Sequence, residues 1–142
     1  MAAPINMQRV FVGGILGGVA WNVWSIIINV GMLGKIYPDA QAAREFLKEP
    51  RYPFFIGAQI VLLLMSGIGV AWLYAASRNT LTPGPGSALK VGLVTGVVCT
   101  VPLNFALSAW LPCSRMFPLG WTLEGLIGCI LAALVAGWFY KE

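Results

Sequence analysis

The chain has 142 residues, of which 58% are hydrophobic and only 10% are charged. Soluble domains carry about 25% charged residues, so this chain lacks the charge to cover a surface that faces water. The absence of histidine excludes histidine-ligated haem, the usual zinc and di-iron sites, and nucleophiles that a histidine activates. The three cysteines form no CxxC pair, so neither a redox motif nor a disulfide framework is indicated.

The charges lie between four long apolar stretches. Residues 10–34, 52–77, 91–114 and 116–140 contain a single charged residue, Glu124. About 20 apolar residues are enough to cross the hydrocarbon core of a bilayer. We therefore predict an all-α polytopic membrane protein: one transmembrane domain over residues 1–142, built as a four-helix bundle with a short amphipathic helix at the interface between helices one and two. The four helices are expected at about residues 9–34, 53–76, 88–111 and 118–140.

The first of these helices carries a small and polar stripe opposite a face of branched apolar side chains. At about 100° per residue, the stripe covers an arc of about 80°. It consists of Gly14, Gly18, Asn22, Ser25 and Asn29. In a membrane such a stripe packs against protein while the apolar face contacts lipid. The run is too long for the apolar part of a secretory signal, so we expect it to be retained.

The stretch 35–53 is the only sizeable polar region of the sequence. Asp39 is placed to cap a short helix that runs through Lys48 and ends before Pro50. Phe46 and two neighbouring apolar residues fall on one side of it, which fits an amphipathic helix lying in the interface plane. An ordinary polar connector is the alternative.

The second and third helices place further polar residues at membrane depth. In the second, Gln59 and Ser66 are seven residues apart and therefore share a face. In the third, small or polar residues recur at every fourth position, which lets another backbone approach closely. This series consists of Gly92, Gly96, Thr100, Asn104 and Ser108. We expect helices one and three to cross closely through their glycine and hydroxyl seams.

The fourth helix contains Glu124, the only acid inside a span. An ionisable group there costs about 2–3 kcal/mol or more unless it is paired or near water. One interpretation is a site coupled to protons or cations. The other is a structural carboxylate, stabilised by the helix N-terminus and by Arg115. Gly125 and Gly128 belong to two series of small residues, so this helix presents a broad smooth face to protein.

The polar side chains of the spans have two explanations. They form interhelical hydrogen bonds, worth about 0.6–1.7 kcal/mol each, or they line a small polar cavity. The candidates for such a cavity or packing seam are Asn22, Ser25, Asn29, Gln59, Ser66, Thr100, Asn104, Ser108 and Glu124. The glycines expected to pack closest are Gly14, Gly18, Gly92, Gly96, Gly125 and Gly128.

Two sequence runs resemble a recurring family of small, uncharacterised bacterial integral membrane proteins with four predicted helices. They are Trp72-Leu73-Tyr74-Ala75-Ala76-x-Arg78 and Pro83-Gly84-Pro85-Gly86-x-Ala88-Leu89-Lys90-x-Gly92, and the tail Tyr140-Lys141-Glu142 is also similar. The resemblance implies the same fold and a location in the bacterial inner membrane, but no activity and no functional residues. The side that carries both termini has fewer acids, which favours termini in the cytoplasm.

These observations favour a non-catalytic membrane protein, either an accessory or structural subunit of a larger complex or a self-associating bundle. The glycine seams exceed what one four-helix bundle needs, and no nucleophile–base pair can be assembled, so we expect no enzyme. The alternatives are a small transporter or channel that uses Glu124 and the inward amides, and a binder of a lipid-like cofactor or pigment. No cofactor is predicted, although a bound lipid would fit. The expected partners are membrane lipid and other subunits or a second copy; nucleic acid is not expected, because basic residues are scattered singly.

Overall fold

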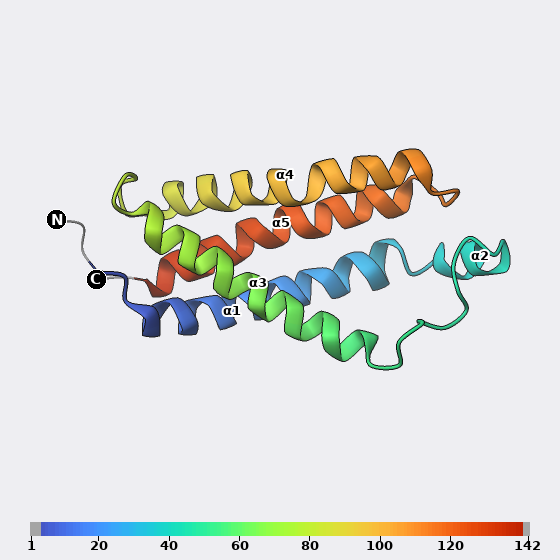
Figure 1. Cartoon of the computed structure of the whole chain (residues 1–142), viewed down its shortest axis with the longest axis horizontal. Coiled ribbons are helices and arrows are strands. Elements are labelled where there is room, and N and C mark those ends of the chain that lie inside the picture. The colour runs from blue at the N-terminus through green and yellow to red at the C-terminus, as the bar shows by residue number, and fades with distance from the viewer. Residues whose placement is uncertain (1–3, 141–142) are drawn as a thin grey trace.

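The computed structural model describes residues 4–140 of the chain, and in that range it is all-helical, without strands. Helix α1 (Met7–Ile26) continues directly into a π-helix, η1 (Ile27–Met32). The short α2 (Tyr37–Ala42) is followed by three long helices, α3 (Phe55–Ser77), α4 (Pro85–Trp110) and α5 (Met116–Phe139). The predicted four-helix architecture with one short extra helix is therefore confirmed (Figure 1).

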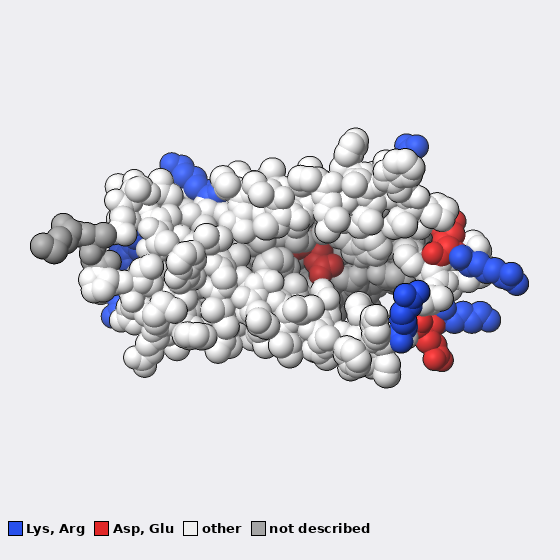
Figure 2. All heavy atoms as spheres, viewed as in Figure 1, with Lys and Arg blue, Asp and Glu red and all other residues white. Residues whose placement is uncertain are grey.

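Four spans are long and apolar enough to cross a membrane, and α1 with η1 forms the first of them. Their ends differ from the predicted ends by at most three residues. The spans run along the long axis in alternating directions, so both chain ends lie at one end of the bundle and α2 lies at the other (Figure 1). Charged side chains gather toward the two ends, and the band between them is white except for one acidic group at mid-length (Figure 2), as expected of a multi-pass membrane protein.

Helix α5 is the centre of the bundle. It packs against α1, α3 and α4, whereas α1 and α4 do not pack against each other. The expected close crossing of the first and third spans, which are α1 and α4, is therefore wrong. The seam glycines of α4 face α5 instead: a Cβ added at Gly92 would lie 2.6 Å from the Cα of Ile130, and one at Gly96 would lie 2.9 Å from the Cα of Leu126.

Two pairs of glycines, on neighbouring faces of α1, let this helix approach two different helices. Gly14 and Gly18 face α3, where an added Cβ would lie 2.5 Å from the Cα of Ile68 and 2.6 Å from that of Leu64. Gly13 and Gly17 face α5 and lie against Ala136 and Ala132. Because a glycine has no side chain, the backbones come closer here than any other residue would allow.

The short helix α2 is shorter than predicted. It begins at Tyr37 with a proline in its first turn, no side chain caps it, and it ends at Ala42 rather than Lys48. Asp39 is therefore inside the helix and is not its cap. The predictions that this helix continues through Lys48 and that it has an amphipathic face beyond residue 42 are therefore wrong.

A turn at Arg44 ends α2 early. Arg44 has φ +62°, and the N–H of Glu45 donates to the carbonyl of Ala40 at 2.9 Å, five residues back. The N–H of Arg44 donates to the carbonyl of Gln41 at 3.1 Å. These bonds form a Schellman motif, in which a residue in the left-handed region terminates a helix. The turn brings Phe46 back onto the bundle.

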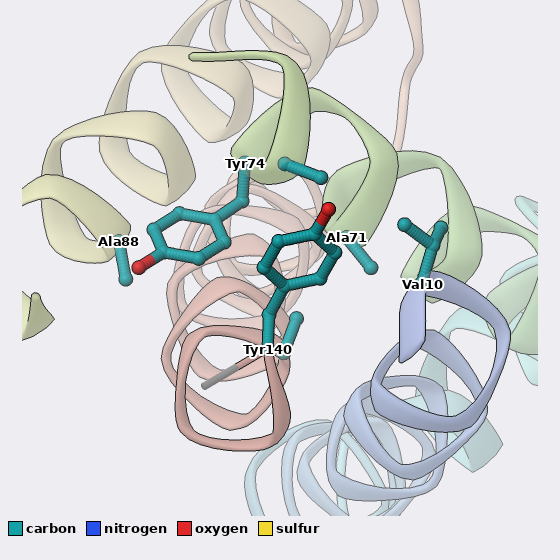
Figure 3. Close-up of a cluster of buried hydrophobic side chains, with 7 residues drawn as sticks. Val10, Ala71, Tyr74, Ala88 and Tyr140 are labelled. Carbon is teal, nitrogen blue, oxygen red and sulfur yellow. The ribbon is translucent and has the colours of Figure 1, made fainter. Parts of the chain in front are cut away.

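The opposite end of the bundle is closed by a small aromatic core. Tyr74 and Tyr140 are almost completely buried, and their rings meet edge to face with centroids 6.4 Å apart. Figure 3 shows them between α3 and α5, with Ala88 from α4 and Val10 from α1 beside them. The Arg78 guanidinium donates to the carbonyl of Tyr140 at 2.9 Å and lies over its ring. These contacts tie the end of α5 to α3.

Two glycines on α3 test the close approach of α1. A Cβ at Gly67 would lie 2.5 Å from the carbonyl oxygen of Gly14 and 2.5 Å from the amide nitrogen of Gly18, both on α1, whereas a Cβ at Gly69 would meet nothing within 4 Å. We expect Gly67→Ala to destabilise the bundle by about 1–3 kcal/mol, because the helices must separate. Gly69→Ala is the matched control and should be neutral or stabilising, since alanine favours helix. Unfolding in detergent micelles measures the stability of both variants. Equal free energies of unfolding for Gly67→Ala and Gly69→Ala would contradict the close packing of α1 on α3.

Candidate functional site

A cavity of about 650 Å³ lies between α1, α3 and α5 in the half of the bundle nearer α2. Its walls are mostly aromatic and aliphatic, among them Trp21, Leu63 and Trp121. Five polar side chains from α1, η1, α3 and α5 converge on it: Asn22, Ser25, Asn29, Gln59 and Glu124. A largely apolar cavity with a few convergent polar groups is the usual form of a small-molecule site.

Glu124 is the centre of this polar group. Its side chain is only 9% exposed. One carboxylate oxygen, Oε1, accepts a hydrogen bond from the Ser25 hydroxyl at 2.7 Å, and the other, Oε2, accepts one from the Asn29 amide at 2.8 Å. Both donors come from the polar stripe of the first span, so the stripe predicted from the sequence holds the carboxylate directly.

The donors around Glu124 are themselves held in place. The Asn29 side-chain N–H also donates to the Ser25 carbonyl at 3.0 Å, and the Tyr37 hydroxyl donates to Asn29 Oδ1 at 3.0 Å. Asn29 lies in η1, and π-helical turns within long helices are frequent at functional sites. The indole N–H of Trp24 donates to the Leu123 carbonyl at 3.2 Å, which fixes α1 against α5 beside the carboxylate.

Among residues 4–140, the Glu124 carboxylate has no positive partner. Its hydrogen bonds within residues 4–140 come only from Ser25 and Asn29, and it forms no ion pair there. The expected partner Arg115 is exposed at the start of α5, so that pairing is wrong. Glu124 lies eight residues after Met116, about 12 Å along the axis, and the helix dipole acts mainly within the first turn. Neutral donors alone therefore stabilise this carboxylate.

The structure leaves the other predicted polar residues outside the cavity. Ser66 is exposed on α3. On α4, Thr100, Asn104 and Ser108 donate hydrogen bonds to carbonyls of their own helix, at Gly96, Thr100 and Phe105. A side chain that donates to a carbonyl three or four residues back satisfies itself without a neighbouring helix. These four residues belong to helix surfaces and packing, and not to the cavity.

All six glycines expected to pack closely do so within this one chain. Gly14 and Gly18 face α3, and Gly92 and Gly96 face α5. Gly125 lies under the Thr100 methyl group, and Gly128 lies under the Trp21 indole. The seams are therefore occupied by the chain's own helices. The subunit role that was expected from an excess of glycine seams stays a prediction.

Two polar groups at the cavity have no hydrogen-bond partner among the described residues. The buried indole N–H of Trp21 lies over Gly128 and finds no acceptor. The Gln59 amide lines the cavity, and none of the hydrogen bonds in residues 4–140 involves its side chain. Trp21 was not among the predicted site residues, because a buried tryptophan on an apolar helix carries no signal that separates packing from binding.

An aromatic group closes the α2 end of the cavity. It consists of Tyr37, Phe46, Phe117 and Trp121, with ring centroids of neighbouring pairs 4.7–6.2 Å apart. Tyr37 and Trp121 line the cavity, and Phe117 behind them is fully buried. The hydrogen bond between Tyr37 and Asn29 depends on the tight turn after η1.

The described residues contain no group of three or more His, Cys, Asp or Glu side chains that could hold a metal ion. No protein-family model, curated protein or solved structure matches the chain. The function is therefore argued from the geometry of the cavity, and the resemblance to uncharacterised bacterial membrane proteins stays a prediction.

Tyr37 gives a pH test of the site. Burial raises the pKa of Tyr37 above its usual value of 10.0; a hydrogen bond with Trp121 lowers this pKa and the charge of Glu124 raises it further. The folded protein therefore keeps the phenol proton to higher pH than the unfolded chain does. The free energy of unfolding should fall as the pH rises above about 10. Tyr37→Phe should remove part of this slope in detergent unfolding; an unchanged slope would contradict the burial of the phenol.

Proposed function

We propose that this multi-pass membrane protein is a small carrier in which a ligand and a proton compete for Glu124. The observation that supports this proposal is a carboxylate, 9% exposed, that faces a cavity and has only neutral hydrogen-bond donors. A buried charge without a counter-ion is costly in a low-dielectric interior. The cost is removed when the carboxylate takes up a proton or when a cation binds beside it.

A purely structural role explains the site less well. The Ser25 and Asn29 donors are both neutral, and a carboxylate that only neutral donors stabilise costs more to bury than an uncharged side chain would. A structural carboxylate is also expected to have a basic partner or to lie in the first turn of its helix, and Glu124 has neither.

A carrier fits the packing better than an open channel does. Beyond Leu63, α1 and α3 come so close that a Cβ at Gly67 would lie 2.5 Å from the Gly14 carbonyl oxygen. A ligand has no room between α1 and α3 in that half of the bundle unless these two helices move. A carrier makes such a movement, and η1, next to Glu124, is an element at which α1 can change its register. The mostly apolar walls also favour a second candidate, a protein that stores a lipid-like molecule in this cavity.

Proton flux in proteoliposomes tests the carrier. The protein is reconstituted with a pH-sensitive dye inside the vesicles, a pH gradient is imposed, and a panel of organic and inorganic cations is added in turn. We expect at least one cation to drive proton movement, and we expect Glu124→Gln to lower that movement at least tenfold. Ser66→Ala is the matched control, because Ser66 is polar, lies on the same bundle and does not line the cavity.

Two results would contradict the carrier. One is the absence of cation-driven proton movement in the wild-type protein. The other is equal movement in the wild-type protein and in Glu124→Gln. A lipid that stays bound through purification and is identified by mass spectrometry, together with no flux, would instead support the storage role.

A further inference from the structure

The cavity opens toward the side of the bundle. The rim that α1, η1 and α3 contribute is formed by exposed apolar side chains, Ile26, Val30, Ile56 and Ile60. Figure 2 views the molecule across its long axis, and it shows one acidic group in a hollow at mid-length; Glu124 is the only acid in the spans. Because the four spans run along that axis, the hollow faces the acyl chains of a bilayer.

The end of the cavity nearest to water is covered. Tyr37 and Trp121 form its wall at the α2 end, and Phe117, with no exposed surface, packs behind them. The Tyr37 hydroxyl is held by Asn29 at 3.0 Å, which ties this wall to the polar group around Glu124. The open side is therefore the one lined by apolar residues, and the closed side is the one that faces water.

The chemistry of the walls selects the ligand. A strongly hydrated inorganic cation would lose its water in this cavity and gain only one carboxylate and a few amides in return. An organic cation with a delocalised or shielded charge loses less hydration, and it gains apolar contact with Leu63 and Phe55 and cation–π contact with Trp21 and Trp121. The same compound concentrates in the bilayer, next to the opening.

We infer that the ligand is an apolar organic cation. It reaches Glu124 sideways from the bilayer, past the rim that α1, η1 and α3 contribute. This inference rests on the proposed function, the competition of ligand and proton for Glu124. When the cation binds, the proton of Glu124 passes to water. The cavity then holds a carboxylate–cation pair in place of a neutral acid, so its net charge stays zero.

The class of ligand is tested with two probes of equal charge. Tetraphenylphosphonium is apolar, and tetramethylammonium is small and hydrophilic. With the protein in lipid nanodiscs and weak buffer, we expect tetraphenylphosphonium to bind and release about one proton for each molecule bound. Tetramethylammonium should bind at least tenfold more weakly. Glu124→Gln should weaken tetraphenylphosphonium binding at least tenfold and release no proton, and circular dichroism checks that this variant is folded.

The route is tested with two tryptophan substitutions at similarly exposed positions. Ile56, 70% exposed, lies on the rim, whereas Val98, 67% exposed, lies on α4, which contributes nothing to the cavity. Ile56→Trp should slow the association of tetraphenylphosphonium at least threefold, and Val98→Trp should leave its rate unchanged. Equal rates in both variants would overturn the sideways route.

The outcomes separate this inference from the function on which it rests. If tetramethylammonium releases the proton and tetraphenylphosphonium does not, the ligand class is wrong while the competition at Glu124 stands. If neither probe nor any other cation releases a proton from the wild-type protein, the proposed function itself fails.

Discussion

The stripe of small and polar residues along the first span determines the rest of the structure. Its glycine half, with Gly14 and Gly18, lets α1 touch α3 backbone to backbone, so these two helices leave no space between them there. Its polar half, with Ser25 and Asn29, faces an open cavity and holds the Glu124 carboxylate. One helix face thus changes its role along its length, from close packing to binding, because the side chains on it change from none to short amides and hydroxyls.

The buried carboxylate gives the cavity its chemistry. An uncharged side chain in place of Glu124 would cost less to bury, and this is why we propose that the acid exchanges a proton for a bound cation. The surroundings are unusual for a charged group: aromatic walls, a closed end at Tyr37 and an opening toward lipid. These features are the grounds on which we propose a ligand that is cationic and apolar.

Much of the architecture is predictable from the sequence, because the spacing of charges and the length of apolar runs fix the spans within a few residues. The inward stripe of the first span is predictable for the same reason, since 3.6-residue periodicity determines which side chains share a face. Which helices pack against each other is not predictable in this way. Gly92 and Gly96 indicate a close helix–helix contact but not which helix makes it, and that helix is α5 rather than α1. The early end of α2 depends on Arg44 in a conformation usual for glycine, and the α4 hydroxyls bond their own backbone.

The central claim is that Glu124 carries a proton which a bound cation displaces. Infrared difference spectroscopy of the protein in lipid measures this directly, because a protonated carboxyl group has a carbonyl band that a carboxylate lacks. The account predicts that this band is lost when tetraphenylphosphonium is added and that Glu124→Gln shows no such change. A band that the cation leaves unaltered, or the same loss in Glu124→Gln, would contradict it.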